Sequence, residues 1–392
     1  MLFLGKIKWE KIMRANAIVI LFIGVLLINS VLLAGSGDKE KLQHFFVGTY
    51  TEGGSEGIYS FSLDPVTGKL KDNGLAAKTN NPSFLALTSN GKYLLSVHET
   101  KGENGSTMGY IESFAVHSDD NRLTSIGKVS SGGAHPCYVS VNQKGYVLAA
   151  NYTGGNVALM RIDESGKLSD TLDVKQHYGS GPDKARQAVP HVHSAFFEPN
   201  SDRIFVADLG IDQVSVYKID NSSSKLANAS VPAIILIPGS GPRHLAFHPT
   251  LKVLYVVNEL ACSVSVVDLN KDGSFTTVET ISTLPTGYDK PNTSADIHIS
   301  KDGRFLYTSN RGLNSIAIFS VDAKSGRIVQ IGQESTRGDG PRNFTLSPDE
   351  NYLLVANQNT QDIVAFRRDN AGKLQFTDQV KALKPVCLLF KK

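Results

Sequence analysis

The chain has 392 residues, of which 40 are Lys or Arg and 37 are Asp or Glu, so its formal net charge is +3. The first 35 residues hold four basic residues and one acidic residue, and the rest of the chain therefore carries 36 of each sign. A neutral body gives no overall attraction for nucleic acid, so we expect no nucleic-acid partner. A chain of this length usually forms two domains, unless one repeat domain spans it.

The N-terminal segment has the pattern of an export signal. Four basic residues precede the apolar residues 17–34, and a polar segment follows at residues 35–40. We predict that residues 1–35 are a signal peptide or an N-terminal membrane anchor, which gives a periplasmic or extracellular location. An uncleaved segment would be the only membrane contact. Met13 would also make a conventional start, and the location becomes cytoplasmic if the segment is misassigned.

A unit of about 51 residues recurs along the chain between Thr49 and Asn357. Each copy has a short apolar run, a polar turn, and a second run that ends in a small residue and a polar one. The runs are rich in Val, Ile, Phe and Tyr and alternate with a period of two, which excludes helical repeats. A period of about 40 to 50 residues built from short strands is typical of a β-propeller. The copies begin at Asn81, His135, Pro190, Gly241, Ser294 and Gly340.

One copy predicts the four strands of a propeller blade, at residues 244–248, 253–258, 263–269 and 275–281. Six blades are complete in this way. The seventh needs both chain ends, because residues 384–390 match a first strand and residues 45–50, 57–64 and 70–78 supply the other three. This closure would remove open sheet edges. We therefore predict an all-β fold over residues 43–392, a seven-bladed β-propeller of four-stranded antiparallel blades closed by pairing of the N- and C-terminal strands.

Two sets of equivalent positions should meet at one mouth of the central channel, because the first strand of a blade starts where the second ends. The first positions of the first strands are Ser83, Cys137, His193, Arg243, Asp296, Arg342 and Val386. The residues that follow the second strands are Tyr50, Glu99, Tyr152, Leu209, Glu259, Arg311 and Gln358. Charged groups gathered in a concave mouth are costly unless they are paired or bind a ligand. We expect a functional site here, and a salt-bridge lattice between blades is the alternative.

Metal binding and disulfides are not predicted. His191 and His193 form a His-x-His pair, but no further Cys, Asp or His accompanies it with ligand spacing. His244 and His248 fall on a strand and are expected to be structural. The three cysteines are an odd number and are expected to be small buried side chains.

With these residues in place, the chain resembles the seven-bladed propeller lactonase family, which includes bacterial 6-phosphogluconolactonases and fungal carboxymuconate lactonizing enzymes. The resemblance covers roughly residues 43–390. It implies a lactonase without a cofactor, whose active site consists of His193, Glu259, Arg243 and Arg311. The motifs that carry it are Val47-Gly-Thr-Tyr-Thr, His135-Pro-Cys-Tyr, Asn151-Tyr-Thr-Gly-Gly, Pro190-His-Val-His-Ser, Gly241-Pro-Arg-His, Val257-Asn-Glu and Ser309-Asn-Arg-Gly.

The function that we predict is hydrolysis of an anionic sugar lactone by a monomeric enzyme. His193 would be the base, Arg243 or Arg311 would supply positive charge, and Glu259 would orient the histidine or protonate the leaving oxygen. Arginines around one mouth favour a phosphate or carboxylate on the substrate. The predicted substrate-binding residues are Arg342, His191, Asp296, Glu99 and Tyr152. Two alternatives stay open: an exported propeller that binds a glycan or protein without catalysis, and a lactonizing enzyme of the muconate type.

Overall fold

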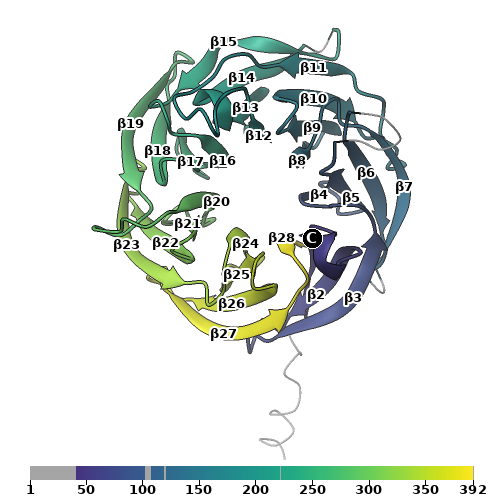
Figure 1. Cartoon of the computed structure of the whole chain (residues 1–392), viewed down its shortest axis with the longest axis vertical. Coiled ribbons are helices and arrows are strands. Elements are labelled where there is room, and N and C mark those ends of the chain that lie inside the picture. The colour runs from purple at the N-terminus through teal and green to yellow at the C-terminus, as the bar shows by residue number, and fades with distance from the viewer. Residues whose placement is uncertain (1–40, 102–106, 119–120, 221, 392) are drawn as a thin grey trace, which may run out of the picture. The chain divides into compact units, whose positions relative to one another are not determined.

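The computed structural model describes residues 41–101, 107–118, 121–220 and 222–391. The chain divides into the units Met1–Lys41 and Leu42–Lys392, and the predicted signal or anchor at residues 1–35 lies outside the described residues. From Leu42 onward, the described residues form seven sheets of four strands, arranged as blades around a central channel (Figure 1). The predicted seven-bladed β-propeller is confirmed. None of the helices within these ranges has the length and apolar character needed to cross a membrane.

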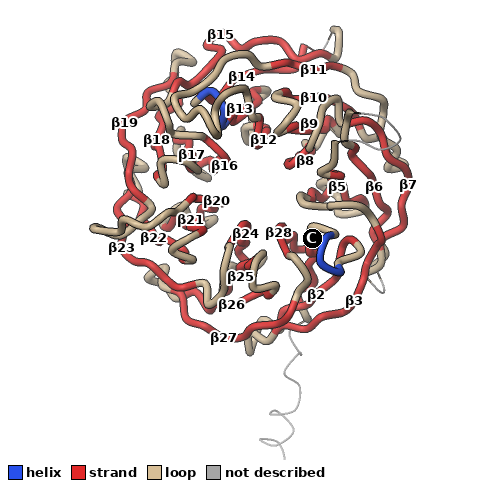
Figure 2. Tube along the Cα trace, viewed as in Figure 1, coloured by secondary structure: helices blue, strands red, loops and turns tan. Residues whose placement is uncertain are grey.

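The strands occupy four equivalent places, counted from the channel outward (Figures 1 and 2). Blade 1 is made of β28, β1, β2 and β3, and blades 2 to 7 follow in chain order. The innermost strands are β28 (Pro385–Phe390), β4 (Leu85–Leu87), β8 (Pro136–Val141), β12 (Val192–Phe197), β16 (Pro242–Phe247), β20 (Thr293–Ile299) and β24 (Pro341–Leu346). The second strands are β1 (Gln43–Thr49), β5 (Tyr93–His98), β9 (Tyr146–Asn151), β13 (Arg203–Asp208), β17 (Val253–Asn258), β21 (Phe305–Arg311) and β25 (Tyr352–Asn357).

The outer half of each blade completes the sheet. The third strands are β2 (Gly57–Leu63), β6 (Tyr110–Val116), β10 (Asn156–Arg161), β14 (Gln213–Asp220), β18 (Ser263–Leu269), β22 (Ser315–Val321) and β26 (Asp362–Arg368). The outermost strands are β3 (Leu70–Lys78), β7 (Leu123–Ser130), β11 (Asp173–Gln176), β15 (Lys225–Ile235), β19 (Phe275–Ser282), β23 (Ile328–Ser335) and β27 (Leu374–Lys381). The described residues also form two short 3-10 helices, η1 (Glu52–Gly54) and η2 (Leu209–Ile211).

The hydrophobic core lies between neighbouring blades. Along β17, Leu254 and Val256 pack toward blade 4, whereas Tyr255 and Val257 pack toward blade 6. Side chains of a strand alternate between the two faces of a sheet, so a strand that is buried on both faces is apolar throughout. This explains why the sequence of β17, Val-Leu-Tyr-Val-Val-Asn, is buried at every position.

The two ends of the chain close the ring as predicted. β28 pairs antiparallel with β1, with Phe45 opposite Phe390 and Gly48 opposite Cys387. Blade 1 therefore contains residues from both ends of the chain, and the innermost strand of its sheet is the last strand of the sequence.

Tyrosines of the second strands in blades 2, 5, 6 and 7 fasten their blade to the outer turn of the next one. Tyr255 of blade 5 donates a hydrogen bond to the carbonyl of Gly326 in blade 6 at 2.8 Å, and Tyr307 of blade 6 donates to the carbonyl of Gly372 in blade 7 at 2.9 Å. Gly326 has a φ of +71°, and an added Cβ would lie 2.9 Å from Val253. The turn needs glycine for both reasons. These contacts hold the blades, and hence the channel mouth, in register.

Candidate active site

A β-bulge at the start of the innermost strand presents one residue of the blade to the channel mouth. In blade 5, Pro242 pairs with Asn258 and His244 with Val257, so Arg243 is left out of the ladder. The same step leaves out His193 in blade 4 and Arg342 in blade 7. A bulge redirects a side chain and frees it from cross-strand pairing, which is why bulges are common at functional sites. The residues at this position, here called the first ring, are Ser83, Cys137, His193, Arg243, Ala295, Arg342 and Val386.

The register of blade 6 differs from the prediction for Asp296. Ser294 pairs with Asn310 and Ile297 with Thr308, so the bulge spans two residues and Ala295 takes the place in the first ring. Asp296 lies one residue deeper, equivalent to His244 in blade 5. Its carboxylate accepts hydrogen bonds from His244 Nδ1 at 2.7 Å and His298 Nε2 at 3.2 Å. Asp296 is buried, with 3% of its surface exposed, and neighbouring side chains satisfy its carboxylate. His244 is buried and hydrogen-bonded to Asp296, which agrees with the structural role that we expected for it.

Glu259 is surrounded by three arginines. Its Oε1 lies 2.6 Å from Nη2 of Arg186, and its Oε2 lies 3.0 Å from Nε of Arg243 and 2.9 Å from Nη2 of Arg311. Burial favours the neutral carboxyl, but the charges of Arg311, Arg243 and Arg186 outweigh it and hold the pKa of Glu259 well below its usual range. The residue is thus a carboxylate at neutral pH. It forms no hydrogen bond to His193 within the described residues, in contrast to one of the two roles that we predicted for it.

Arg243 is the most deeply buried of these cations, with 2% of its surface exposed. Burial, together with the charges of Arg342 and Arg311, lowers its pKa to about 10, so it stays protonated at neutral pH. Its Nη1 donates to the carbonyl of Ala295 at 2.5 Å. Although Nε lies 3.0 Å from Glu259, it is not aligned for a hydrogen bond and is left without one. The contact with Glu259 is therefore an ion pair rather than a hydrogen bond.

His193 is a buried, uncharged histidine beside these cations. It is 4% exposed. Burial, followed by the nearby charge of Arg243, pushes its pKa well below the ordinary value for histidine. Sγ of Cys137 lies 3.8 Å from its Nδ1, and its Nε2 has no hydrogen-bond partner in the described parts of the chain. The imidazole can therefore accept a proton at neutral pH.

A second polar cluster lies on the other side of the mouth, in blades 1, 2 and 7. Oε2 of Glu99 accepts hydrogen bonds from Tyr50, at 2.9 Å, and from Ser83. The guanidinium of Arg342 lies over the ring of Tyr50, 5.5 Å from its centroid. Burial alone would lower the pKa of Arg342, but Tyr50, Glu99 and Glu259 raise it. The guanidinium makes no hydrogen bond or salt bridge to another described residue, so its donors remain open to a ligand.

His191 and Tyr152 form an aromatic wall beside His193. Their rings are stacked, with centroids 4.4 Å apart, and the ring of Tyr152 also meets His193 edge-on at 5.6 Å. Nδ1 of His191 is hydrogen-bonded to the carbonyl of Tyr152 at 3.1 Å. The structure therefore brings eight of the nine predicted site residues to one mouth, and Asp296 belongs to the layer below.

Sequence reasoning missed Arg186. This residue lies in the segment 177–191 that joins β11 to β12, outside the repeated strands. The segment has 15 residues, whereas the other connections between blades have between 3 and 10. Connections longer than about 12 residues are uncommon and often functional, so its length was the available signal.

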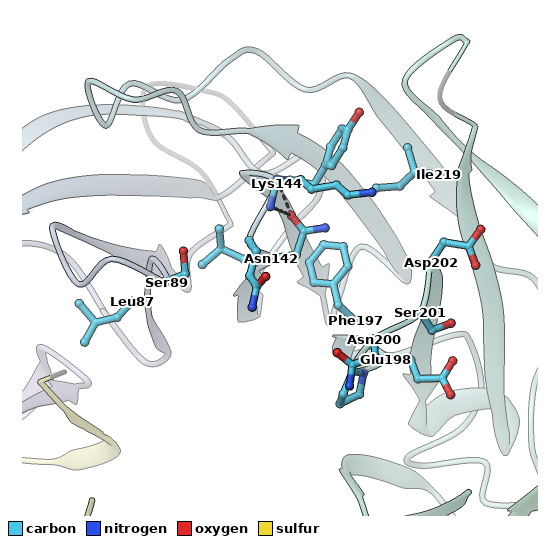
Figure 3. Close-up of a pocket in the computed structure, with 14 residues that line it drawn as sticks. Leu87, Ser89, Asn142, Lys144, Phe197, Glu198, Asn200, Ser201, Asp202 and Ile219 are labelled. Atoms are coloured by element: carbon cyan, nitrogen blue, oxygen red, sulfur yellow. Dashed lines mark hydrogen bonds between the residues drawn. The ribbon is translucent and has the colours of Figure 1, made fainter. Parts of the chain in front are cut away.

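A cavity of about 660 Å³ opens at the opposite end of the channel, in blades 2, 3 and 4 (Figure 3). It contains none of the predicted site residues. Two of its polar side chains already have local partners: Asn142 accepts a hydrogen bond from the backbone N–H of Lys144 at 3.0 Å, and Glu198 accepts from Arg203 at 2.7 and 2.8 Å. We therefore place the candidate site at the mouth that contains His193.

Within the described residues, the channel mouth contains neither a metal-binding cluster nor a disulfide. No group of three His, Cys, Asp or Glu side chains in the described residues could hold a metal ion. Cys137, Cys262 and Cys387 are buried free thiols, as predicted.

Comparisons with known proteins agree with this architecture. A family model described as "Lactonase, 7-bladed beta-propeller" matches residues 44–390. The chain is 36% identical over 349 residues to 6-phosphogluconolactonase of Bacillus subtilis, covering 88% of this chain and 97% of that protein. It is 38% identical over 336 residues to 6-phosphogluconolactonase of Formosa agariphila, covering 84% and 94%. The structure of the periplasmic gluconolactonase of Pseudomonas aeruginosa is similar, with a TM-score of 0.85, 33% identity, and coverage of 90% and 99%. The chain thus belongs to the seven-bladed β-propeller lactonase family.

Proposed function

We propose that this protein hydrolyses an anionic sugar lactone of the 6-phosphogluconolactone type, and that the residues of the channel mouth do so without a cofactor. The observation that carries the proposal is an uncharged, buried His193 beside Arg243, with Arg342 unpaired nearby. Opening a lactone with water needs a base and a positive charge near the carbonyl oxygen. The names of the relatives from Bacillus subtilis and Formosa agariphila support the same reaction.

His193 is the proposed base. Its Nε2 takes a proton from a water molecule while the water oxygen bonds to the carbonyl carbon of the lactone. The pKa of His193 lies below its usual range because of burial and Arg243, so at neutral pH the imidazole is uncharged, which is the form that a general base requires. The step gives an imidazolium and a tetrahedral carbon that carries an oxyanion.

Arg243 is the proposed partner of the oxyanion. Its guanidinium lies close enough to His193 for its charge to lower the pKa of that residue, so the same charge can stabilise an oxyanion that forms beside His193. When the tetrahedral intermediate collapses, the bond between the carbonyl carbon and the ring oxygen breaks. The ring oxygen then takes the proton from the imidazolium of His193, which yields the open hydroxy acid and restores the base.

Glu259 and Arg342 have separate proposed roles. Glu259 is too acidic to donate a proton at neutral pH, so we assign to it the positioning of Arg243 and Arg311. Arg342 has no ion-pair partner in the described residues and is proposed to bind the anionic group of the substrate as a guanidinium fork. His191, Tyr152 and Glu99 would line the sugar.

A pH-stat assay on the purified protein with a panel of aldonolactones tests this function. We expect acid release with phosphorylated or carboxylated lactones and weaker release with gluconolactone. Muconate-type substrates belong in the same panel, because the alternative lactonizing reaction uses the same mouth. A folded protein that opens none of these lactones would overturn the proposal and leave a binding role as the better explanation.

We also propose that the protein is exported, because the apolar residues 17–34 follow a basic start. Cell fractionation should find a chain that lacks about 35 residues outside the cytoplasm. Full-length chain confined to the cytosol would contradict export.

A further inference from the structure

The segment that carries Arg186 is fixed to the propeller at both of its ends. Nδ1 of His177 lies 2.8 Å from Asp208, and the backbone N–H of His191 donates to the same carboxylate at 2.7 Å. Between them, the fully buried Gln187 donates to Asp212 at 2.7 Å. These contacts leave Arg186, next to Gln187, at a defined place above the mouth.

The side chain of Arg186 differs from the other two arginines around Glu259. Arg243 and Arg311 come from the strand framework and share Oε2, whereas Arg186 comes from the connecting segment and contacts Oε1 alone. Its side chain is 38% exposed, compared with 2% for Arg243 and 20% for Arg311. Of the three arginines around Glu259, Arg186 is therefore the most accessible to a ligand.

One nitrogen of Arg186 is used and the other two are open. Nη2 donates to Glu259 at 2.6 Å and reaches the hydroxyl of Tyr152 at 3.4 Å. Nη1 and Nε make no hydrogen bond to any residue that the structure describes. Glu259 and Tyr152 thus hold the guanidinium through Nη2, and Nη1 is left to donate to a ligand. A single carboxylate also offsets only one of the three positive charges around it.

From this geometry we propose that Arg186 is a specificity-determining residue, which donates from its free Nη1 to an anionic group on the substrate and so favours acidic lactones over neutral ones. The proposal rests on the lactonase function proposed above and adds to it a second cation for the same anionic group that Arg342 binds, since the charge of Glu259 acts on both arginines. A phosphate or carboxylate oxygen accepts a charge-assisted hydrogen bond from a guanidinium N–H, which is stronger than the hydrogen bond that a neutral hydroxyl accepts.

The test compares 6-phosphogluconolactone with gluconolactone in the wild type and in Arg186→Ala and Arg186→Lys. Loss of a charge-assisted hydrogen-bonded contact should lower kcat/KM for the phosphorylated lactone by about 10- to 100-fold in Arg186→Ala and change the neutral lactone much less. Arg186→Lys should recover part of the loss, because it keeps the positive charge but not the planar guanidinium that Glu259 and Tyr152 orient. Calorimetry with 6-phosphogluconate and gluconate gives the same comparison without turnover.

Lys184→Ala is the matched control, since Lys184 is an exposed cation of the same segment and contacts only the carbonyl of Gly181, at 3.4 Å. Its preference between the two lactones should equal that of the wild type. An active wild type whose preference is unchanged in a folded Arg186→Ala would overturn the role of Arg186 alone. A folded wild type without turnover of either lactone would instead overturn the proposed function, and the specificity role with it.

Discussion

Nη2 of Arg311 lies 2.9 Å from Oε2 of Glu259, and this contact joins blade 6 to blade 5 at the channel mouth. The same carboxylate also holds Arg243 from its own blade and Arg186 from the segment before blade 4. Glu259 therefore connects the scaffold to the candidate site. Part of the salt-bridge lattice that we considered as an alternative is present, and it uses the same residues as the proposed chemistry.

Replacing Glu259 with Gln should weaken both the fold and the site. The variant leaves three guanidiniums without a counter-charge, and removing one partner of a buried ion pair typically costs about 3 to 5 kcal/mol of unfolding free energy. Denaturant unfolding measures this loss, with Glu164→Gln in an exposed turn as the control. An unchanged midpoint would mean that the three arginines do not depend on Glu259.

Replacing His193 with Asn tests the base. Turnover of an anionic lactone should fall by about 10²- to 10⁴-fold, while the melting temperature stays close to that of the wild type. Because the pKa of His193 is lowered, kcat/KM of the wild type should stay level from neutral pH to well below pH 6.5 before it drops. A variant that melts early but keeps its rate would show that His193 is structural.

Replacing Arg342 with Ala separates substrate binding from scaffold. Arg342 has no salt bridge in the described residues, so its loss should change the unfolding free energy little. The KM for an anionic lactone should rise more than kcat falls, because Arg342 is proposed to bind a part of the substrate that is remote from the reacting bond. Steady-state kinetics and thermal unfolding on the same preparation distinguish a substrate-binding role of Arg342 from a structural one. Reduced stability with unchanged KM would contradict the binding role.

The fold could be predicted from the sequence because period-two apolar runs recur at a nearly constant spacing. In addition, residues 384–390 and 45–50 match the first and second strands of one blade. The position of Asp296 could not be predicted in this way. Its bulge spans two residues rather than one, and the sequence Ser-Ala-Asp-Ile aligns with either register. Arg186 lies in a connection outside the repeat, so no equivalent position in another blade pointed to it. The three arginine partners of Glu259 come from the connecting segment, blade 5 and blade 6, so their contacts with it appear only when the chain is folded.

Acid should destabilise the protein in two pH ranges. The pKa of His193 is far below 6.5 and burial lowers that of His244 to about 4. Below about pH 6.5 the unfolded chain therefore binds protons that the folded chain does not, and stability falls by up to about 1.4 kcal/mol per pH unit for each group. Below about pH 4, Glu259 and Asp296, whose pKa values are lowered, remove further stability.

Unfolding free energies measured from pH 7 to pH 3 test this dependence. His244→Asn should flatten the slope between pH 6.5 and 4, and His117→Gln, at an exposed position, should leave it unchanged. A stability that does not vary between pH 7 and 5 would contradict a buried, neutral histidine pair.

Deleting residues 385–392 should open the ring. The deletion removes β28, whose buried side chains Val386, Cys387 and Leu388 pack in blade 1, and it leaves β1 as an unpaired edge beside the channel. Burying one such side chain contributes about 1.5 to 3 kcal/mol, so losing three approaches the whole stability of a typical domain. We expect the guanidinium midpoint of the truncated protein to collapse. A synthetic peptide with the sequence of residues 385–390 should restore it, because the peptide can pair with β1 as the native strand does. An identical midpoint with and without these residues would show that the pairing of β1 with β28 adds nothing to the stability of the ring.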